Sequence, residues 1–269
     1  MEKRTSNGIT LDCVGLIPAA GRGTRLGEQS LSKEVLPLPD ECGPPGEDRR
    51  VSDCLLEGFR RAGIEQVFWV IREGKWDIPR HYGDGRSRDM AFAWVMMDAP
   101  WGTPFSLDQA WPFIKDKTVA LGFPDIQFRP LVVYARLLEQ LRCSDADVML
   151  AAFPADRPDK FDMLDIDGQG RVLEIQIKPP RTELQYCWAN AVWKPAFSRY
   201  MHQFIQQALD EFDLSRHPEI YVGTVLQMAM AEGFRVEAVR FPEGRVLDLG
   251  TPEDFSRVAG FEAGTGGAT

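Results

Sequence analysis

Short, continuous apolar runs alternate with amphipathic segments through the first half of the chain. The run at 13–18 is bounded by polar residues and is typical of a strand buried on both faces of a sheet. The segment 51–62 instead has helical periodicity, with Leu55 and Phe59 on one side and Arg60 on the other. This pattern predicts a buried strand followed by a helix that packs one face on a sheet.

The same alternation continues as far as residue 153. Further buried strands are expected at 66–71, 93–97, 118–122 and 148–153, with a helix at 131–141. Strands that alternate with helices at this spacing predict a mostly parallel sheet with right-handed crossovers. The expected fold class is therefore α/β, with a Rossmann-like, mostly parallel mixed sheet flanked by helices.

After residue 160 the pattern becomes less regular. Strands are expected at 161–166, 171–177, 186–193 and 235–240, and helices at 201–212 and 222–232. No internal repeat or long linker divides the chain, so we expect one domain at 11–258, with halves at 11–155 and 156–258. The two ends, 1–10 and 259–269, are expected to be flexible.

The net charge and the cysteines limit the classes of function. A formal net charge of −9 disfavours nonspecific nucleic-acid binding, which needs basic patches. The five cysteines include no Cys-x-x-Cys pair, unlike those of a structural zinc site. No apolar run has the character of a signal sequence or of a membrane span. We therefore expect a cytoplasmic protein without nucleic-acid or membrane partners.

A glycine-rich basic loop follows the first predicted strand. Gly21 and Gly23 allow the backbone to bend close to phosphates, while Arg25 and Lys33 supply positive charge. The loop lacks the Gly-Lys-Ser/Thr ending of a Walker loop, and Gly27 comes one residue late for a dinucleotide fingerprint. On residue types alone, a phosphate-binding loop and an ordinary turn with solvated cations both stay open.

Residues 16–26 read Leu-Ile-Pro-Ala-Ala-Gly-Arg-Gly-Thr-Arg-Leu, and residues 32–38 read Ser-Lys-Glu-Val-Leu-Pro-Leu. These stretches resemble the signature of the sugar nucleotidyltransferase family, and within it they are most similar to the hexose-1-phosphate thymidylyl- and uridylyltransferases. The resemblance implies a nucleotide-diphospho-sugar transferase type of fold with a single catalytic domain. It implies that 11–155 binds the nucleotide and 156–258 the sugar phosphate. The implied reaction couples a nucleoside triphosphate with a sugar 1-phosphate and releases pyrophosphate.

The resemblance also assigns roles within the loop. It implies that Arg25 and Lys33 are catalytic, because they would stabilise the departing pyrophosphate and the pentavalent phosphorus. The triphosphate-binding positions that it implies are Ala20, Gly21, Gly23 and Thr24. The nucleophile is an anionic phosphate oxygen, so such a reaction needs alignment and charge neutralisation rather than a general base.

Two distant carboxylates match metal-binding positions of the family. Asp125 lies in Leu-Gly-Phe-Pro-Asp-Ile-Gln-Phe at 121–128, and Asp248 opens Asp-Leu-Gly-Thr-Pro-Glu-Asp at 248–254. The resemblance implies that both bind Mg²⁺, a cation that suits two carboxylates completed by waters and substrate phosphates. Pro124 replaces the glycine that is usual before the first carboxylate. A turn or helix-capping role is the alternative interpretation of Asp125.

The positions implied to contact the sugar phosphate and the base match less well. Lys178 corresponds to a lysine that binds the phosphate of the sugar phosphate, but Ile177 stands where relatives have a glutamate that hydrogen-bonds sugar hydroxyls. Asn190, in the predicted sugar-contact strand, replaces a usual glycine. Asp98 and Gly102 fall in the base-binding stretch, where the usual glutamine is absent. The identities of the base and of the sugar stay open.

Two other functions stay open at this point. One is a nucleotidyltransferase whose phosphorylated acceptor is not a sugar, which the departures on the acceptor side keep open. The other is a non-catalytic nucleotide-sugar sensor on the same fold, against which the retained cations and both carboxylates argue. A homo-oligomeric state is also left open by the sequence.

We predict that Arg25→Ala lowers the turnover number by about 10²-fold or more, because the change removes a preorganised positive charge from the reacting phosphates. Steady-state pyrophosphate release by the purified wild type and variant measures the effect. Turnover of the variant at the wild-type rate would show that Arg25 is not catalytic.

Overall fold

The computed structural model describes residues 12–21, 31–39, 48–98, 101–211 and 219–263. Gly23, Thr24 and Arg25 of the glycine-rich loop lie outside these ranges, so their assigned roles stay predictions. Within the described ranges, no helix has both the length and the apolar composition that a membrane span requires.

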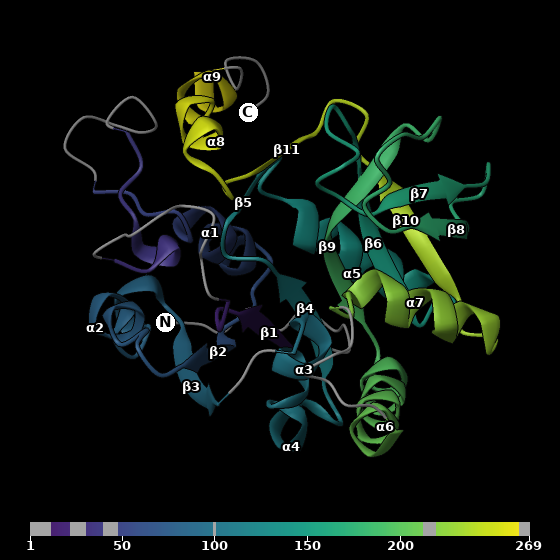
Figure 1. The fold of residues 1–269 in the computed structure, drawn as a ribbon, viewed down its shortest axis with the longest axis horizontal. Helices are drawn as coiled ribbons and strands as arrows, with labels where there is room; N and C mark the ends of the chain where they lie inside the picture. The colour runs from purple at the N-terminus through teal and green to yellow at the C-terminus, as the bar shows by residue number, and fades with distance from the viewer. Residues whose placement is uncertain (1–11, 22–30, 40–47, 99–100, 212–218, 264–269) are drawn as a thin grey trace, which may run out of the picture.

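Among the described residues, a nine-stranded mixed sheet runs through the molecule, with its main path in the order β10, β6, β9, β4, β1, β2, β3 (Figure 1). These strands are β1 (Cys13–Pro18), β2 (Gln66–Arg72), β3 (Ala91–Met97), β4 (Thr118–Gly122), β6 (Val148–Pro154), β9 (Tyr186–Trp193) and β10 (Val236–Arg240). β1 is parallel to β2 and β4, β2 to β3, and β6 to β10, whereas β9 is antiparallel to both β4 and β6. The predicted α/β class with a mostly parallel mixed sheet is confirmed.

Two short antiparallel pairings accompany the main path. β7 (Met163–Ile166) pairs with β8 (Val172–Gln176) and with the start of β9. β5 (Ile126–Arg129) pairs with β11 (Arg245–Asp248) in a separate two-stranded sheet. The hydrophobic pattern predicts neither β5 nor β11, because strands of four residues are too short to show a period.

Helices cover both faces of the main sheet (Figure 1). One face carries α1 (Asp53–Arg61), α2 (Asp77–Tyr82) and α5 (Val133–Cys143). The other carries α3 (Thr103–Asp108), α4 (Trp111–Ile114), α6 (Pro195–Glu211) and α7 (Val222–Ala231). The chain ends beyond β11 with α8 (Pro252–Ser256) and α9 (Val258–Ala263), and the 3₁₀ turns are η2 (Lys33–Val35) and η4 (Arg86–Arg88).

The apolar core lies in two layers, one on each face of the sheet. In β1, Leu16 belongs to the layer that contains α3 and α6, whereas Ile17 belongs to the layer that contains α1 and α5. Both side chains are fully buried. A strand covered on both faces needs apolar residues at successive positions, which explains the continuous apolar run at 13–18.

The last residue of β4 allows the sheet and two helices to approach closely. A Cβ at Gly122 would lie 2.1 Å from Leu55 Cδ1 and 2.7 Å from the Tyr134 hydroxyl. That hydroxyl donates to the Leu121 carbonyl at 2.8 Å and accepts from the Asn190 amide at 2.9 Å. Space therefore requires the glycine, because α1 and α5 both lie against this end of β4.

Two boundaries differ from the sequence expectation. α6 begins at Pro195 rather than at 201, because proline is well accommodated in the first turn of a helix. Helix α9 extends into the segment 259–269, and the flexibility expected of that segment stays a prediction. Val258 and Phe261 share one helix face and belong to a buried apolar cluster, which holds this turn of helix in place.

We predict that Gly122→Ala lowers the free energy of unfolding by about 1–3 kcal/mol, because the added methyl group overpacks a filled site. Urea titration followed by circular dichroism measures the change. Gly168→Ala is the matched control, since no atom lies within 4 Å of a Cβ at that position. Equal stabilities of the two variants would contradict the close packing at Gly122.

Candidate active site

The carboxyl ends of the parallel strands meet at one edge of the sheet, which is where open α/β sheets bind ligands. The residues at this edge are Ala20 and Gly21 after β1, Arg72 at the end of β2, Asp98 after β3 and Asp125 after β4. Arg72 Nε donates to the Ala20 carbonyl at 3.1 Å and ties the ends of β1 and β2 together. Apart from Arg72, each of these residues is a predicted site residue.

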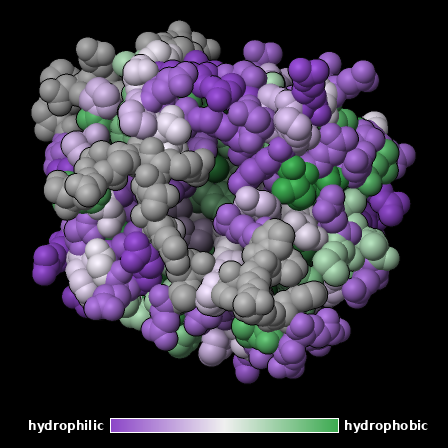
Figure 2. Space-filling view, viewed as in Figure 1, coloured by the Kyte–Doolittle hydropathy of each residue, from purple (hydrophilic) through white to green (hydrophobic). Residues whose placement is uncertain are grey.

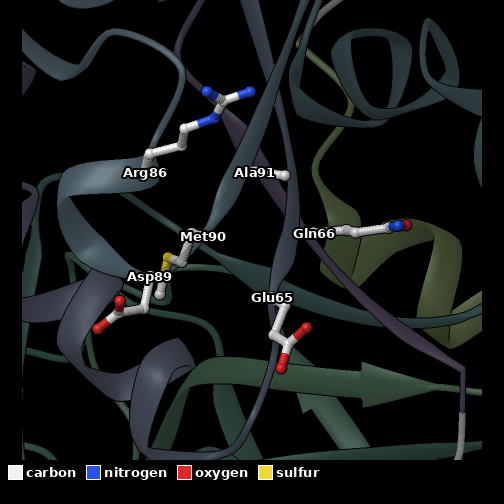
Figure 3. A pocket seen from close by; sticks show the side chains of 6 residues that line it. All are labelled: Glu65, Gln66, Arg86, Asp89, Met90 and Ala91. Atoms are coloured by element: carbon white, nitrogen blue, oxygen red, sulfur yellow. The ribbon is translucent and has the colours of Figure 1, made fainter.

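A surface hollow lies at the opposite edge of the sheet. Its lining residues are Glu65, Gln66, Arg86, Asp89, Met90 and Ala91 (Figure 3). Gln66 and Ala91 begin β2 and β3, so this hollow is at the amino ends of the strands and is not part of the candidate site. Figure 2 shows a recess nearer the middle of the molecule, with apolar side chains inside it.

The pairing of β5 with β11 brings two distant carboxylates together. Asp125 immediately precedes β5, and Asp248 ends β11 opposite Ile126. The Leu249 N–H donates to the Asp125 carbonyl at 2.9 Å and continues this pairing. The two residues that the sequence assigns to a metal thus lie on adjacent segments, while their metal-binding role stays a prediction.

The ammonium group of Lys33 contacts one of these carboxylates and lies near the other. Lys33 Nζ forms an ion pair with Asp125 Oδ2, and the two side chains are 17% and 13% exposed. Burial lowers the pKa of Lys33, but nearby carboxylates outweigh burial and hold the pKa above its ordinary value. These carboxylates are Asp125, Glu34 and Asp248.

The same pairing keeps Asp125 ionised. Burial raises the pKa of its carboxyl group, but the charge and the hydrogen bond of Lys33 more than offset burial and hold the pKa below its ordinary value. Near neutral pH, Lys33 is therefore a cation and Asp125 an anion. The site presents a fixed positive charge beside a fixed negative charge at the carboxyl edge of the sheet.

A second and more deeply buried ion pair holds the turn η2 that carries Lys33. The carboxylate of Glu34, which is fully buried, accepts from Lys75 Nζ at 2.6 Å. Next to it, the Ser32 N–H and hydroxyl donate to the Asp77 carboxylate at 2.5 and 2.7 Å. These contacts fix η2 to the start of α2 on both sides of Lys33, so the position of its ammonium group is set by the fold.

The Glu34–Lys75 pair carries a desolvation cost. Burial is the largest influence on the pKa of Lys75 and lowers it, against the raising effect of Glu34. The charges of Lys33 and Arg72 lower this pKa further. Oε2 of Glu34 has no hydrogen-bond partner among the described residues. Buried ion pairs contribute little net stability, which indicates that this one serves mainly to position the turn.

Asp125 and Asp248 are of the donor type that suits a hard divalent cation, and both lie near the Lys33 ammonium group. Mg²⁺ commonly takes one or two protein carboxylates and completes its shell with waters and phosphate oxygens. Within the described ranges, no group of three or more His, Cys, Asp or Glu side chains is arranged to hold a metal. The two carboxylates therefore suit a cation that arrives with a phosphorylated substrate.

Lys178 lies in a constrained turn after β8. Its φ of 39° is uncommon for a residue with a side chain. Its Nζ lies 4.0 Å from the ring centroid of Tyr221, which precedes α7. The residue is exposed. A cation–π contact thus orients an accessible ammonium group, as a phosphate-binding lysine requires.

Asn190 points toward α5. Its Nδ2 donates to the Tyr134 hydroxyl at 2.9 Å, and the residue is 1% exposed. A bulge in the pairing of β9 with β6 lies between Asn190 and Trp188, and Trp188 packs in the opposite layer. This geometry gives Asn190 a packing role, and its contact with a sugar phosphate stays a prediction.

Asp98 and Gly102 lie on either side of two residues outside the described ranges. Asp98 is exposed at the end of β3. Gly102 has a φ of 124°, and a Cβ there would lie 2.5 Å from the Ile220 carbonyl. The close approach of two backbones therefore explains Gly102, while base contacts by either residue stay predictions.

Three polar side chains that lie near the predicted ones are not evident as site residues from the sequence. They are Lys75, Asp162 and Trp188. A lysine shortly after a buried strand is the one available signal for Lys75, and it is weak because such turns are usually solvated. Asp162 and Trp188 become neighbours only through the pairing of β7 with β9.

We predict that Lys75→Met lowers the free energy of unfolding by about 3–5 kcal/mol, because Glu34 would remain buried and charged without a partner. Chemical denaturation at neutral pH measures the loss. The control is the double variant Lys75→Met/Glu34→Gln, which removes the uncompensated charge and is expected to recover much of the loss. A single variant as stable as the wild type would contradict the role given to this pair.

The chain resembles known proteins in both sequence and fold. The family model described as nucleotidyl transferase matches residues 14–263. The low-salt glycan biosynthesis nucleotidyltransferase Agl11 of Haloferax volcanii is 23% identical over 245 residues, which cover 89% of this chain and 63% of that protein. The chain thus spans less than two thirds of the length of this curated relative.

Two solved structures share the fold. One, described as a glucose-1-phosphate thymidylyltransferase from Bacillus anthracis in complex with sucrose, has a TM-score of 0.77 and 15% identity over 96% of this chain and 98% of that one. The other, UDP-glucose pyrophosphorylase complexed with UDP-glucose, has a TM-score of 0.74 and 16% identity over 95% of this chain and 99% of that one. The family that the sequence motifs predict is therefore confirmed: this chain belongs to the nucleotidyl transferase family.

Proposed function

We propose that this chain is a Mg²⁺-dependent enzyme that joins a nucleoside triphosphate to a sugar 1-phosphate, giving a nucleotide sugar and pyrophosphate. The observation that carries the proposal is the cluster of Lys33, Asp125 and Asp248 at the carboxyl edge of the sheet. A fixed cation beside two carboxylates suits a reaction in which negative charge develops on phosphates.

The residues of this chain would act by alignment and charge neutralisation. The phosphate oxygen of the acceptor is already an anion, so no general base is needed. Lys33 stabilises the charge that develops at the α-phosphate and on the pyrophosphate, and its raised pKa keeps it protonated. Lys178, exposed beside Tyr221, holds the acceptor phosphate. Arg25 of the glycine-rich loop adds a second cation at the pyrophosphate.

Asp125 and Asp248 would hold the magnesium ion. When bound, Mg²⁺ neutralises charge on the substrate phosphates and makes the phosphorus easier to attack. Asp125 keeps its negative charge because Lys33 lies against it, and the ionised form is the one that binds a cation. The backbone pairing that continues to Leu249 holds Asp125 and Asp248 on adjacent segments, offset by one position.

The names of similar proteins support the acceptor class. Agl11 is named a glycan biosynthesis nucleotidyltransferase, and the two solved structures are named for glucose 1-phosphate and UDP-glucose. Sugar phosphates are therefore the first acceptors to test. The described cysteines Cys13, Cys54, Cys143 and Cys187 form no disulfide bond with one another, and a cytoplasmic location for the reaction stays a prediction from the sequence.

Pyrophosphate release with a matrix of substrates tests the proposed function. The purified chain is incubated with Mg²⁺, each of ATP, GTP, CTP, UTP and dTTP, and acceptors that include glucose 1-phosphate, a phospho-alcohol and a phosphonate. Release that depends on a sugar 1-phosphate supports the proposal. Release only with another acceptor would show that the acceptor is not a sugar phosphate. No release with any pair would favour a nucleotide-sugar sensor.

We predict that Lys33→Ala lowers kcat by about 10²-fold or more, because a preorganised positive charge leaves the reacting phosphates. Lys117→Ala is the matched control. Lys117 forms an ion pair with Asp12 just before β4, at the amino edge of the sheet, so its loss is expected to leave kcat unchanged. Equal activity of the two variants would contradict the role of Lys33.

A further inference from the structure

Two buried polar atoms near Lys178 lack hydrogen-bond partners. Across the part of the chain that the structure describes, Asp162 Oδ1 and Trp188 Nε1 are both unpaired. Asp162 is 8% exposed and Trp188 is 4% exposed. Buried carboxylates and indole N–H groups normally find partners, because an unpaired one costs free energy. Two such atoms in one place indicate a position made for a ligand.

Strand pairing holds these two side chains together. β7 pairs with β9 so that Met163 lies opposite Cys187. The backbone N–H of Trp188 donates to the backbone carbonyl of Asp162 at 3.2 Å. The Trp188 indole interacts with the Asp162 carboxylate as a hydrogen-bond donor and so lowers its pKa, but the geometry leaves both Nε1 and Oδ1 without a completed hydrogen bond. A donor and an acceptor are thus held near each other without satisfying each other.

Helix α7 closes the other side of the carboxylate. A Cβ at Gly223 would lie 2.3 Å from Asp162 Oδ2 and 2.6 Å from Ile177 Cδ1. The start of α7 therefore packs directly on Oδ2 and on Ile177, and Oδ1 is the buried oxygen without a partner. Burial raises the pKa of Asp162 to about 6, against the lowering effects of the Lys178 charge and the Lys178 backbone N–H. At pH 8 the group is a carboxylate, which can only accept hydrogen bonds.

The pair is continuous with the proposed site. The ring centroid of Trp188 lies 6.1 Å from that of Phe123, which lies between β4 and Asp125. Asp162 in turn lies near enough to Lys178 for the lysine charge to lower the pKa of its carboxyl group. The two unpaired atoms therefore lie between the lysine proposed for the acceptor phosphate and the segment that carries Asp125. This is where the remainder of a phosphorylated acceptor would lie.

A hydroxyl group, of a ligand or of a water that a ligand hydroxyl displaces, satisfies both atoms at once. It can donate to Asp162 Oδ1 and accept from Trp188 Nε1. An ammonium group has no lone pair for the indole N–H, and a carbonyl or phosphate oxygen has no hydrogen for the carboxylate. We propose that Asp162 and Trp188 form a hydroxyl-reading pair that selects phosphorylated polyols, such as sugar phosphates, as acceptors. This inference rests on the proposed function and defines its acceptor by chemistry.

Two variants and two matched controls test the pair. Asp162→Asn keeps the shape and removes the charge, and Trp188→Phe removes the indole N–H. The first control is Asp159→Asn, because Asp159 is a half-exposed carboxylate nearby in sequence. The second is Trp193→Phe, because Trp193 is fully buried on the same strand and its Nε1 already donates to Ser198 at 2.8 Å.

Calorimetric titration with glucose 1-phosphate and each of its monodeoxy analogues measures acceptor binding, and steady-state kinetics measures KM for both substrates. Asp162→Asn and Trp188→Phe are each expected to weaken glucose 1-phosphate binding by about 10–100-fold, the scale of one charge-assisted hydrogen bond, with KM for the nucleotide unchanged. One deoxy analogue should bind the wild type as weakly as the variants bind glucose 1-phosphate. The variants should no longer distinguish that analogue from glucose 1-phosphate.

Thermal melting at pH 8 separates hydroxyl binding from a structural role. Folding raises the pKa of the Asp162 carboxyl to about 6, so the folded protein binds this proton more tightly than the unfolded chain does. The group therefore lowers the free energy of unfolding as the pH rises above the unfolded-state pKa. Asp162→Asn is therefore expected to melt at pH 8 no lower than the wild type while binding the acceptor more weakly. A lower melting temperature with unchanged acceptor binding would assign Asp162 a structural role and overturn the inference.

The outcomes distinguish this inference from the function on which it rests. Acceptor binding that is unchanged in Asp162→Asn and Trp188→Phe, or equally weakened in the two controls, would overturn the hydroxyl-reading pair and leave nucleotidyl transfer intact. A wild type that binds no phosphorylated acceptor and releases no pyrophosphate would overturn both.

Discussion

The pairing of β5 with β11 is the constraint on which the candidate site depends, because it brings Asp125 and Asp248 together from distant parts of the chain. Two carboxylates in a poorly solvated place repel each other unless a cation is near. Lys33 is that cation, and the buried pair of Glu34 with Lys75 holds the turn that carries it. The strand pairing, the charge balance and the position of the turn therefore depend on one another.

Polar groups are paired within the protein at one end of the site and are left without partners at the other. Around Lys33, positive and negative groups compensate each other within the protein. Beside Lys178, the Asp162 carboxylate and the Trp188 indole are buried with atoms that have no partner among the described residues. This division suits an enzyme of this family, since phosphate charges are common to many substrates while hydroxyl positions distinguish one acceptor from another.

The sequence predicts the strands that are buried on both faces, such as 118–122, because their apolar runs are continuous. It assigns Asp125 through a motif, but its proximity to Asp248 depends on a pairing of two strands too short to show a pattern. The direction of Asn190 follows from a bulge, which alternation cannot reveal. Ile177 stands where a carboxylate is expected, and the carboxylate of Asp162, just before β7, lies next to it. Such non-local placement is what a single sequence leaves undetermined.

Manganese binding followed by electron paramagnetic resonance tests the central claim, that Asp125 and Asp248 form one cation site with a nucleoside triphosphate. Mn²⁺ is titrated with the triphosphate present into the wild type, Asp125→Asn, Asp248→Asn and the control Asp159→Asn. The account predicts one bound Mn²⁺ per wild-type or control chain, and affinity at least about 10-fold weaker in each site variant, on the scale of losing a charged ligand contact. Equal affinity in all four proteins would contradict it.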